Sequence, residues 1–109
     1  VSLFWQAEKA PSRDYTVFVH LYGPAGNWVA GADGQPVYGE YPMGQWTKGE
    51  IVEDIHVIVL DAALTPGPYR VAVGLYDLAT GQRLLAELNG KLLPENAFYL
   101  QPNVDLITP

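Results

Sequence analysis

A turn–strand–turn segment in the second half of the chain sets the strongest limit on the fold. A Pro-Gly-Pro turn at 66–68 leads into a run in which large apolar residues alternate with small or polar ones. The residues that share one face of this run are Tyr69, Val71, Val73 and Leu75. The run ends at an Asp-Leu-Ala-Thr-Gly turn at 77–81. A period-two pattern between two turns indicates an antiparallel strand with one buried face.

Shorter alternating segments recur along the chain, separated by residues typical of turns. They lie at 1–7, 15–22, 28–30, 51–59, 82–88, 97–100 and 103–107. We expect 82–88 to form a hairpin with the strand at 69–75. Pro102 places the last piece at a sheet edge or at a switch between sheets, because proline donates no hydrogen bond to a neighbouring strand. Residues 35–50 read as a long loop, and no segment has a convincing helical period.

The direction of each strand face follows from the same alternation. Ile51, Ile55, Val57 and Val59 fall on one face, which we expect to point into the core. Short strands with a turn every eight to twelve residues or so are typical of an immunoglobulin-like fold. The prediction is therefore an all-β, immunoglobulin-like antiparallel β-sandwich of about seven to eight strands. A small closed barrel is the alternative.

Composition limits what this fold can do. The 109 residues suit a single domain, 1–109, which we expect to be excised from a longer protein because it starts inside a strand-like run. Six Lys and Arg against 12 Asp and Glu give a net charge of −6, which argues against nucleic acid and anionic lipid as partners. The absence of Cys excludes disulfides, thiol catalysis and Cys-ligated zinc.

Polar residues give little support for catalysis. His20 and His56 are the two histidines, with no short spacing between them, and we expect them to be surface or inter-strand residues rather than metal ligands. The carboxylates show no recognisable acid–base pair. We therefore assign no catalytic residue, no metal site and no cofactor.

Four aromatic residues are better candidates for a binding site, since they lie in or beside the long loop. These residues are Trp28, Tyr38, Tyr41 and Trp46. Flat rings stack on the apolar faces of sugars, and the amides of Asn27, Gln35 and Gln45 can bond the hydroxyls. The alternative is that some of these rings, Trp46 above all, pack into the core of a small domain.

Three segments resemble one family. Residues 14–21 (DYTVFVHL), the Trp46 to Val52 segment (W-x-x-G-E-x-V) and the hairpin at 66–81 are similar to C-terminal soluble domains of large bacterial membrane proteins. Those proteins resemble multi-spanning glycosyltransferases of the dolichyl-phosphate-mannose-dependent mannosyltransferase type. The resemblance covers about residues 3–84, and it departs at Pro68 and Leu78, both in turns.

The resemblance implies a non-catalytic accessory domain on the extracytoplasmic face of a bacterial membrane. Its expected partners are the membrane portion of the same polypeptide and an acceptor or glycan. Two other hypotheses remain open. One is a carbohydrate-binding module that uses the loop aromatics, and the other is a structural interaction domain that pairs through an exposed edge strand.

Overall fold

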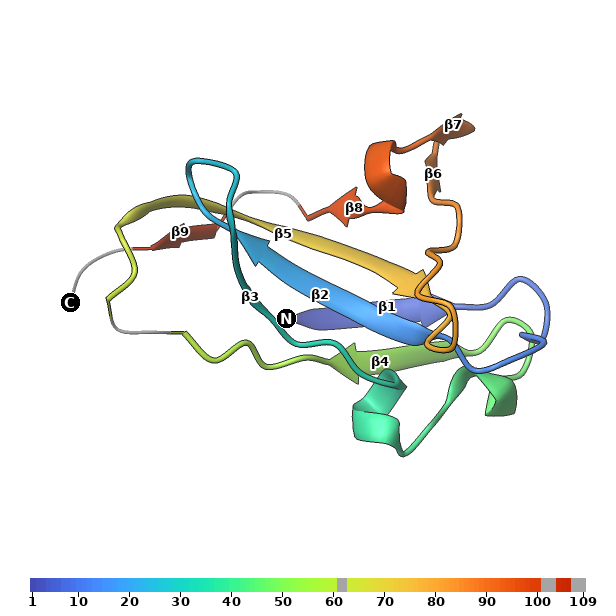
Figure 1. Cartoon of the computed structure of the whole chain (residues 1–109). Coiled ribbons are helices and arrows are strands. Elements are labelled where there is room, and N and C mark those ends of the chain that lie inside the picture. The colour runs from blue at the N-terminus through green and yellow to red at the C-terminus, as the bar shows by residue number, and fades with distance from the viewer. Residues whose placement is uncertain (61–62, 101–103, 107–109) are drawn as a thin grey trace.

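The computed structural model describes residues 1–60, 63–100 and 104–106, and its regular structure is almost entirely β (Figure 1). The strands are β1 (Ser2–Gln6), β2 (Thr16–Tyr22), β3 (Trp28–Gly31), β4 (Ile51–Ile55), β5 (Gly67–Tyr76), β6 (Glu87–Leu88), β7 (Lys91–Leu92), β8 (Phe98–Tyr99) and β9 (Val104–Leu106). Single 3₁₀ turns lie at Pro36–Gly39, Met43–Gln45 and Pro94–Asn96. The all-β prediction is confirmed, and so is the irregular character of 35–50.

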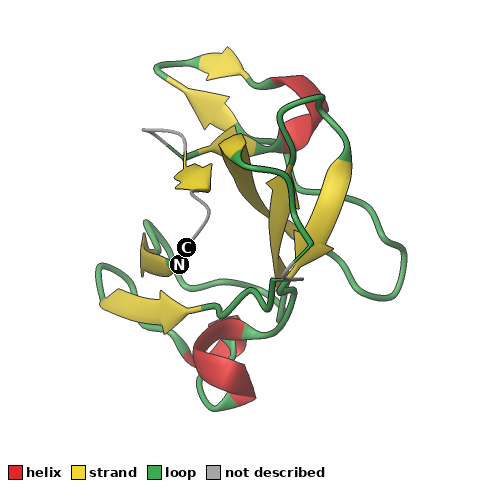
Figure 2. Ribbon diagram, turned by 90° about the vertical axis from the view of Figure 1, so that its left-hand side faces the viewer, coloured by secondary structure: helices red, strands yellow, loops and turns green. Residues whose placement is uncertain are grey.

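The strands form one larger sheet and two small ones. The larger sheet has the order β3-β2-β5-β8, and β9 also pairs with β5. β1 and β4 form a separate antiparallel pair, and β6 and β7 form a short hairpin. Figure 2 shows that this hairpin lies at the opposite end of the molecule from the 3₁₀ turns of the long loop.

The main core lies between the larger sheet and the β1–β4 pair. Val19 of β2 and Val71 of β5 pack in one cluster with Leu3 of β1 and Val52 of β4. Burial of the expected faces of β2 and β5 confirms the alternation there, including Tyr69 at 2% exposed. The two sheets therefore bury a common apolar layer, which supplies most of the stabilisation of such a domain.

The orientation of β4 differs from the prediction. Ile51, Glu53 and Ile55 are exposed, whereas Val52 and Asp54 point inward. Val57 and Val59 beyond the strand are also exposed. Because side chains alternate across a strand, a shift of one residue inverts the whole face. The inward position is held by Asp54, which is fully buried and hydrogen-bonded by three groups.

The expected hairpin after β5 also differs. A bridge from Tyr76 to Arg83 continues the turn, with bonds from the Asp77 N–H to the Gln82 carbonyl oxygen and from the Leu84 N–H to the Leu75 carbonyl oxygen. The chain then leaves β5, and Glu87–Leu88 pairs with Lys91–Leu92 instead. β8 and β9 take the adjacent edge of β5, as expected for edge pieces, while Pro102 lies outside the described residues.

The outer face of the larger sheet carries a second, smaller core. Phe18 and Ala72 are buried there with Ala97, which precedes β8. The guanidinium of Arg83 lies 4.2 Å from the centre of the Phe18 ring. The segment that follows β5 therefore folds over this face and covers it.

Candidate functional site

A buried polar network anchors the long loop to the β1–β4 pair. The indole Nε1–H of Trp5 donates to Asp54 Oδ2 at 3.1 Å, and the Val37 N–H donates to Asp54 Oδ1 at 2.8 Å. His56 Nε2 lies 2.7 Å from Asp54 Oδ2, and its Nδ1 lies 2.6 Å from the carbonyl oxygen of Ala32. Four segments of the chain thus meet at the Asp54–His56 pair. Buried polar groups require partners of this kind.

The geometry of His56 shows what this network can do chemically. A carbonyl oxygen only accepts, so Nδ1 must donate to Ala32, and the remaining nitrogen faces the Asp54 carboxyl group. Both ring nitrogens are therefore occupied by hydrogen bonds within the protein. A histidine that acts as a general base needs a nitrogen free to face a substrate or nucleophile. The pair is thus built for structure. Of the two positions expected for His56, the surface position is wrong, since the residue is 6% exposed. Its ring lies instead between Asp54 of β4 and Ala32, which follows β3.

The network holds the next turn in an unusual backbone conformation. Val37 and Tyr38 have φ values of 56° and 55°, and Gly39 follows with φ of 82°. The left-handed region disfavours residues with a β-branched or bulky side chain. The hydrogen bond from the Val37 N–H to buried Asp54 offsets part of this cost. Such strained residues persist only where their surroundings hold them, and they cluster at ligand-binding sites.

This left-handed turn presents Tyr38 at a surface cavity of about 490 Å³. The tyrosine is 71% exposed. The lining residues are Ala32, Asp33, Gly34, Gln35, Tyr38, Gly39, Ile55, His56 and Val57. We call this cavity the Tyr38 pocket. It combines an aromatic ring and aliphatic side chains with amide and carboxylate groups, the usual composition of a small-molecule site.

The polar groups that line the Tyr38 pocket differ in their hydrogen bonding: Asp33 has partners within the protein, whereas the side-chain oxygen of Gln35 does not. Asp33 Oδ1 accepts from the Val19 N–H at 3.1 Å and lies 3.2 Å from His20 Nε2. The side-chain oxygen of Gln35 is buried and has no hydrogen-bond partner among the described residues.

The other three predicted aromatics lie elsewhere. Trp28 is 58% exposed on β3, with its ring edge-on to His20 at 6.4 Å, and it does not line the Tyr38 pocket. Trp46 is 5% exposed in the main core, with its Nε1–H donated to the Tyr41 carbonyl oxygen at 3.0 Å. The structure thus places Trp46 in the core, the alternative for this residue, and removes its ring from a surface platform.

Tyr41 is engaged by a carboxylate. Its hydroxyl lies 2.7 and 2.9 Å from the two carboxylate oxygens of Glu50, and its ring packs 6.4 Å from that of Trp46. The hydrogen bond to Glu50 raises the pKa of Tyr41. The same bond, with a second from the Thr47 N–H, lowers the pKa of Glu50. Tyr41 therefore fixes the loop. The four aromatics form no common platform in the described residues.

Sequence reasoning missed the Asp54–His56 pair as a unit. The signal was present, because residues two apart on a strand share a face and both are polar. Their partners Trp5 and Val37 come from distant segments, which the pattern does not reveal.

Comparisons with known proteins assign no family to this chain. No protein-family model, no curated protein and no solved structure matches this chain. The described residues hold no group of three side chains suited to a metal ion, and no helix among them is long and apolar enough to cross a membrane.

Proposed function

We propose that this chain is a non-catalytic accessory domain that binds a glycan or glycan-bearing acceptor at the Tyr38 pocket. The observation that carries the proposal is the exposed Tyr38 ring, held at the mouth of the pocket by a strained turn. An ordered aromatic ring beside amide and carboxylate groups suits a pyranose, which has apolar faces and a rim of hydroxyls. The commitment of both His56 nitrogens supports a binding role over a hydrolytic one.

The wider context of this proposal rests on the family resemblance of 14–21 and 66–81. In this context the domain has an immunoglobulin-like fold and belongs to a membrane-bound glycosyltransferase-like protein of a bacterium. It works outside the cytoplasm, next to the membrane portion of the same polypeptide. Two antiparallel sheets packed over one core are compatible with that fold.

Affinity electrophoresis in gels that contain soluble polysaccharides, followed by a glycan array, tests the binding proposal. Tyr38→Ala should abolish retention, because it removes the stacking ring. Trp28→Ala is the matched control, since it removes an exposed ring outside the pocket and should leave retention unchanged. The proposal fails if no glycan is retained, or if the two variants behave alike.

Hydrolysis assays test the non-catalytic part of the proposal. The isolated domain should show no turnover of glycosides or esters. Robust hydrolysis that disappears on substitution of a single carboxylate would contradict it.

A structural interaction domain is the second candidate function, favoured by the outer face of the β1–β4 pair. Phe4 and Ile51 are 67% and 66% exposed there, with Ile55 at 39%. The partner for this face is the membrane portion of the same polypeptide. Phe4→Ser should then leave the isolated domain equally stable and should raise proteolytic cleavage of this domain in the full-length protein. Unchanged cleavage would argue against this role.

A further inference from the structure

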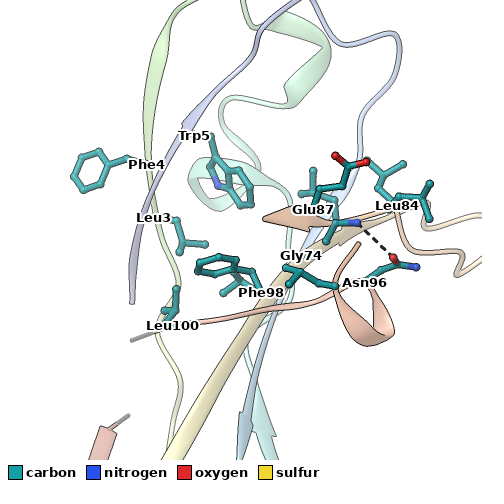
Figure 3. Close-up of a pocket in the computed structure, with 14 residues that line it drawn as sticks. Leu3, Phe4, Trp5, Gly74, Leu84, Glu87, Asn96, Phe98 and Leu100 are labelled. Carbon is teal, nitrogen blue, oxygen red and sulfur yellow. Dashed lines mark hydrogen bonds between the residues drawn. The ribbon is translucent and has the colours of Figure 1, made fainter. Parts of the chain in front are cut away.

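The free edge of β1 lies beside an apolar groove that shares no lining residue with the Tyr38 pocket. The groove has a volume of about 410 Å³ and includes Leu3, Phe4 and Trp5 of β1 but no residue of β4. Leu75 of β5 and Phe98 of β8 also line it. Figure 3 shows Trp5 and Phe98 lining the groove and Phe4 turned away from it. The volume falls within the range of about 300–1,000 Å³ typical of ligand pockets.

The hydrogen-bond pattern of β1 shows which backbone groups face this groove. Val1 and His56 exchange both backbone bonds at 2.9 Å, the N-terminal amine serving as the donor of Val1. In an antiparallel pair such residues alternate with residues that turn their groups away from the partner. Leu3 and Trp5 therefore bond to β4, and the groups of Ser2, Phe4 and Gln6 point to the free edge. Among the described residues, β1 pairs with β4 alone.

β1 also lacks the features that normally protect an edge. Its sequence, SLFWQ, has no charged residue and no proline. Natural sheets block exposed edges with such residues or with bulges, because an open edge binds another strand. The edge of β3 is different, since its pairing with β2 has a register shift between Leu21 and Tyr22.

Charge selects the kind of strand that would fit. Glu87 is the charged residue of the groove lining, and it forms no ion pair in the described structure. In Figure 3, Glu87 lies near Leu84, on the opposite side of the groove from Phe4. A second copy of this chain would bring a further net charge of −6 to this edge, so self-association is disfavoured.

From these observations we propose that β1 accepts an extended, basic and apolar peptide segment as an added strand. The segment bonds to the backbone of Ser2, Phe4 and Gln6, places alternate apolar side chains against Trp5 and Phe98, and sets a lysine or arginine opposite Glu87. This is strand addition, in which backbone bonds supply affinity and side-chain pockets supply specificity.

Two synthetic peptides test this proposal. Both have nine residues in which valine alternates with threonine, with lysine at the centre of one and glutamate at the centre of the other. Amide hydrogen exchange by NMR should show Phe4 and Gln6 slowed about tenfold by the lysine peptide. Leu3 and Trp5, already bonded to β4, should change much less. This alternation within one strand separates strand addition from general stabilisation.

Charge reversal supplies the second measurement. Glu87→Lys should weaken the lysine peptide about fivefold and strengthen the glutamate peptide, because the ion pair is replaced by repulsion. Glu53→Lys is the matched control, since it makes the same change on the exposed face outside the groove and should have a much smaller effect. The proposal is overturned if neither peptide protects Phe4 and Gln6, if both bind equally, or if the domain pairs with itself through β1.

Discussion

The Phe18 ring fills the space that a side chain on Gly74 would occupy. These residues face each other directly across β2 and β5. A Cβ atom built on Gly74 would overlap the Phe18 ring and would lie 3.0 Å from the carbonyl oxygen of Asn96. Glycine is therefore required at this position by close packing, and its φ is not in the left-handed region.

Gly74→Ala should consequently destabilise the domain by about 1–3 kcal/mol, the usual cost of overpacking. Urea unfolding followed by tryptophan fluorescence measures the change. Gly34→Ala is the matched control, because a Cβ there meets nothing within 4 Å. It should change stability by no more than about 0.5 kcal/mol. Phe18→Leu should recover part of the loss in the Gly74→Ala background, and equal effects of the two glycine substitutions would contradict this account.

Asp54→Asn should destabilise the domain by about 2–3 kcal/mol. One amide oxygen cannot replace both carboxylate oxygens, so either the Trp5 indole N–H or the Val37 N–H would face a donor. Thermal and urea unfolding measure the loss. Glu53→Gln, an exposed neighbour on the same strand, should have almost no effect. If the two amide substitutions cost the same, the Asp54 network does not stabilise the fold.

Tyr38→Gly and Tyr38→Ala should differ in stability although both remove the ring. Glycine adopts the φ of 55° at Tyr38 without the penalty that other residues have. The glycine variant should therefore be more stable than the alanine variant by about 1 kcal/mol, as measured by chemical denaturation. Both variants should lose glycan retention. A more stable alanine variant would show that the left-handed turn is not strained.

Tyr41→Phe should raise the pKa of Glu50 toward its ordinary value, since the Tyr41 hydroxyl bond is the largest cause of its lowering. A carboxyl group whose pKa is lowered by folding stabilises the folded state above its unfolded pKa, and this contribution disappears as the pH falls through the folded pKa. The pKa of Tyr41 is raised in the folded state. Its contribution to stability is therefore present at lower pH and is lost in the alkaline range, as the pH rises through the folded pKa of Tyr41.

NMR titration of the Glu50 side-chain carboxyl carbon measures this shift. The wild-type midpoint should lie below the ordinary value of a glutamate, and it should move upward in Tyr41→Phe. An unchanged Glu50 midpoint would mean that the bonds to Thr47 alone lower it.

Particular strands show how far the sequence predicts the fold. The faces of β2 and β5 follow from alternation, because Val17, Val19, Val71 and Val73 leave little choice of orientation. β4 was inverted in the prediction because Asp54 is charged and Ile55 is apolar. The reversal is stable only with the hydrogen bonds that Asp54 makes to Trp5, Val37 and His56, which lie outside the strand pattern.

The candidate site was predicted only in part. Of the residues identified by type, Tyr38 and Gln35 line the same pocket. The other candidates do not line it: Asn27, Trp28, Tyr41, Gln45 and Trp46. The left-handed turn that presents Tyr38 could not be predicted, since valine and tyrosine disfavour that conformation by themselves. It depends on a hydrogen bond to Asp54, 17 residues away in the sequence from Val37.

The pairing of distant segments has a consequence for the order in which the domain forms. β1 cannot form its strand pair until β4 is available, because Ser2 pairs with Ile55 and Gln6 with Ile51. The edge of β5 is completed only by β8 and β9, near the end of the chain. Contacts between distant residues slow folding. During synthesis the apolar face of β1 therefore emerges long before its partner, and the larger sheet can be completed only after β8 and β9 have left the ribosome.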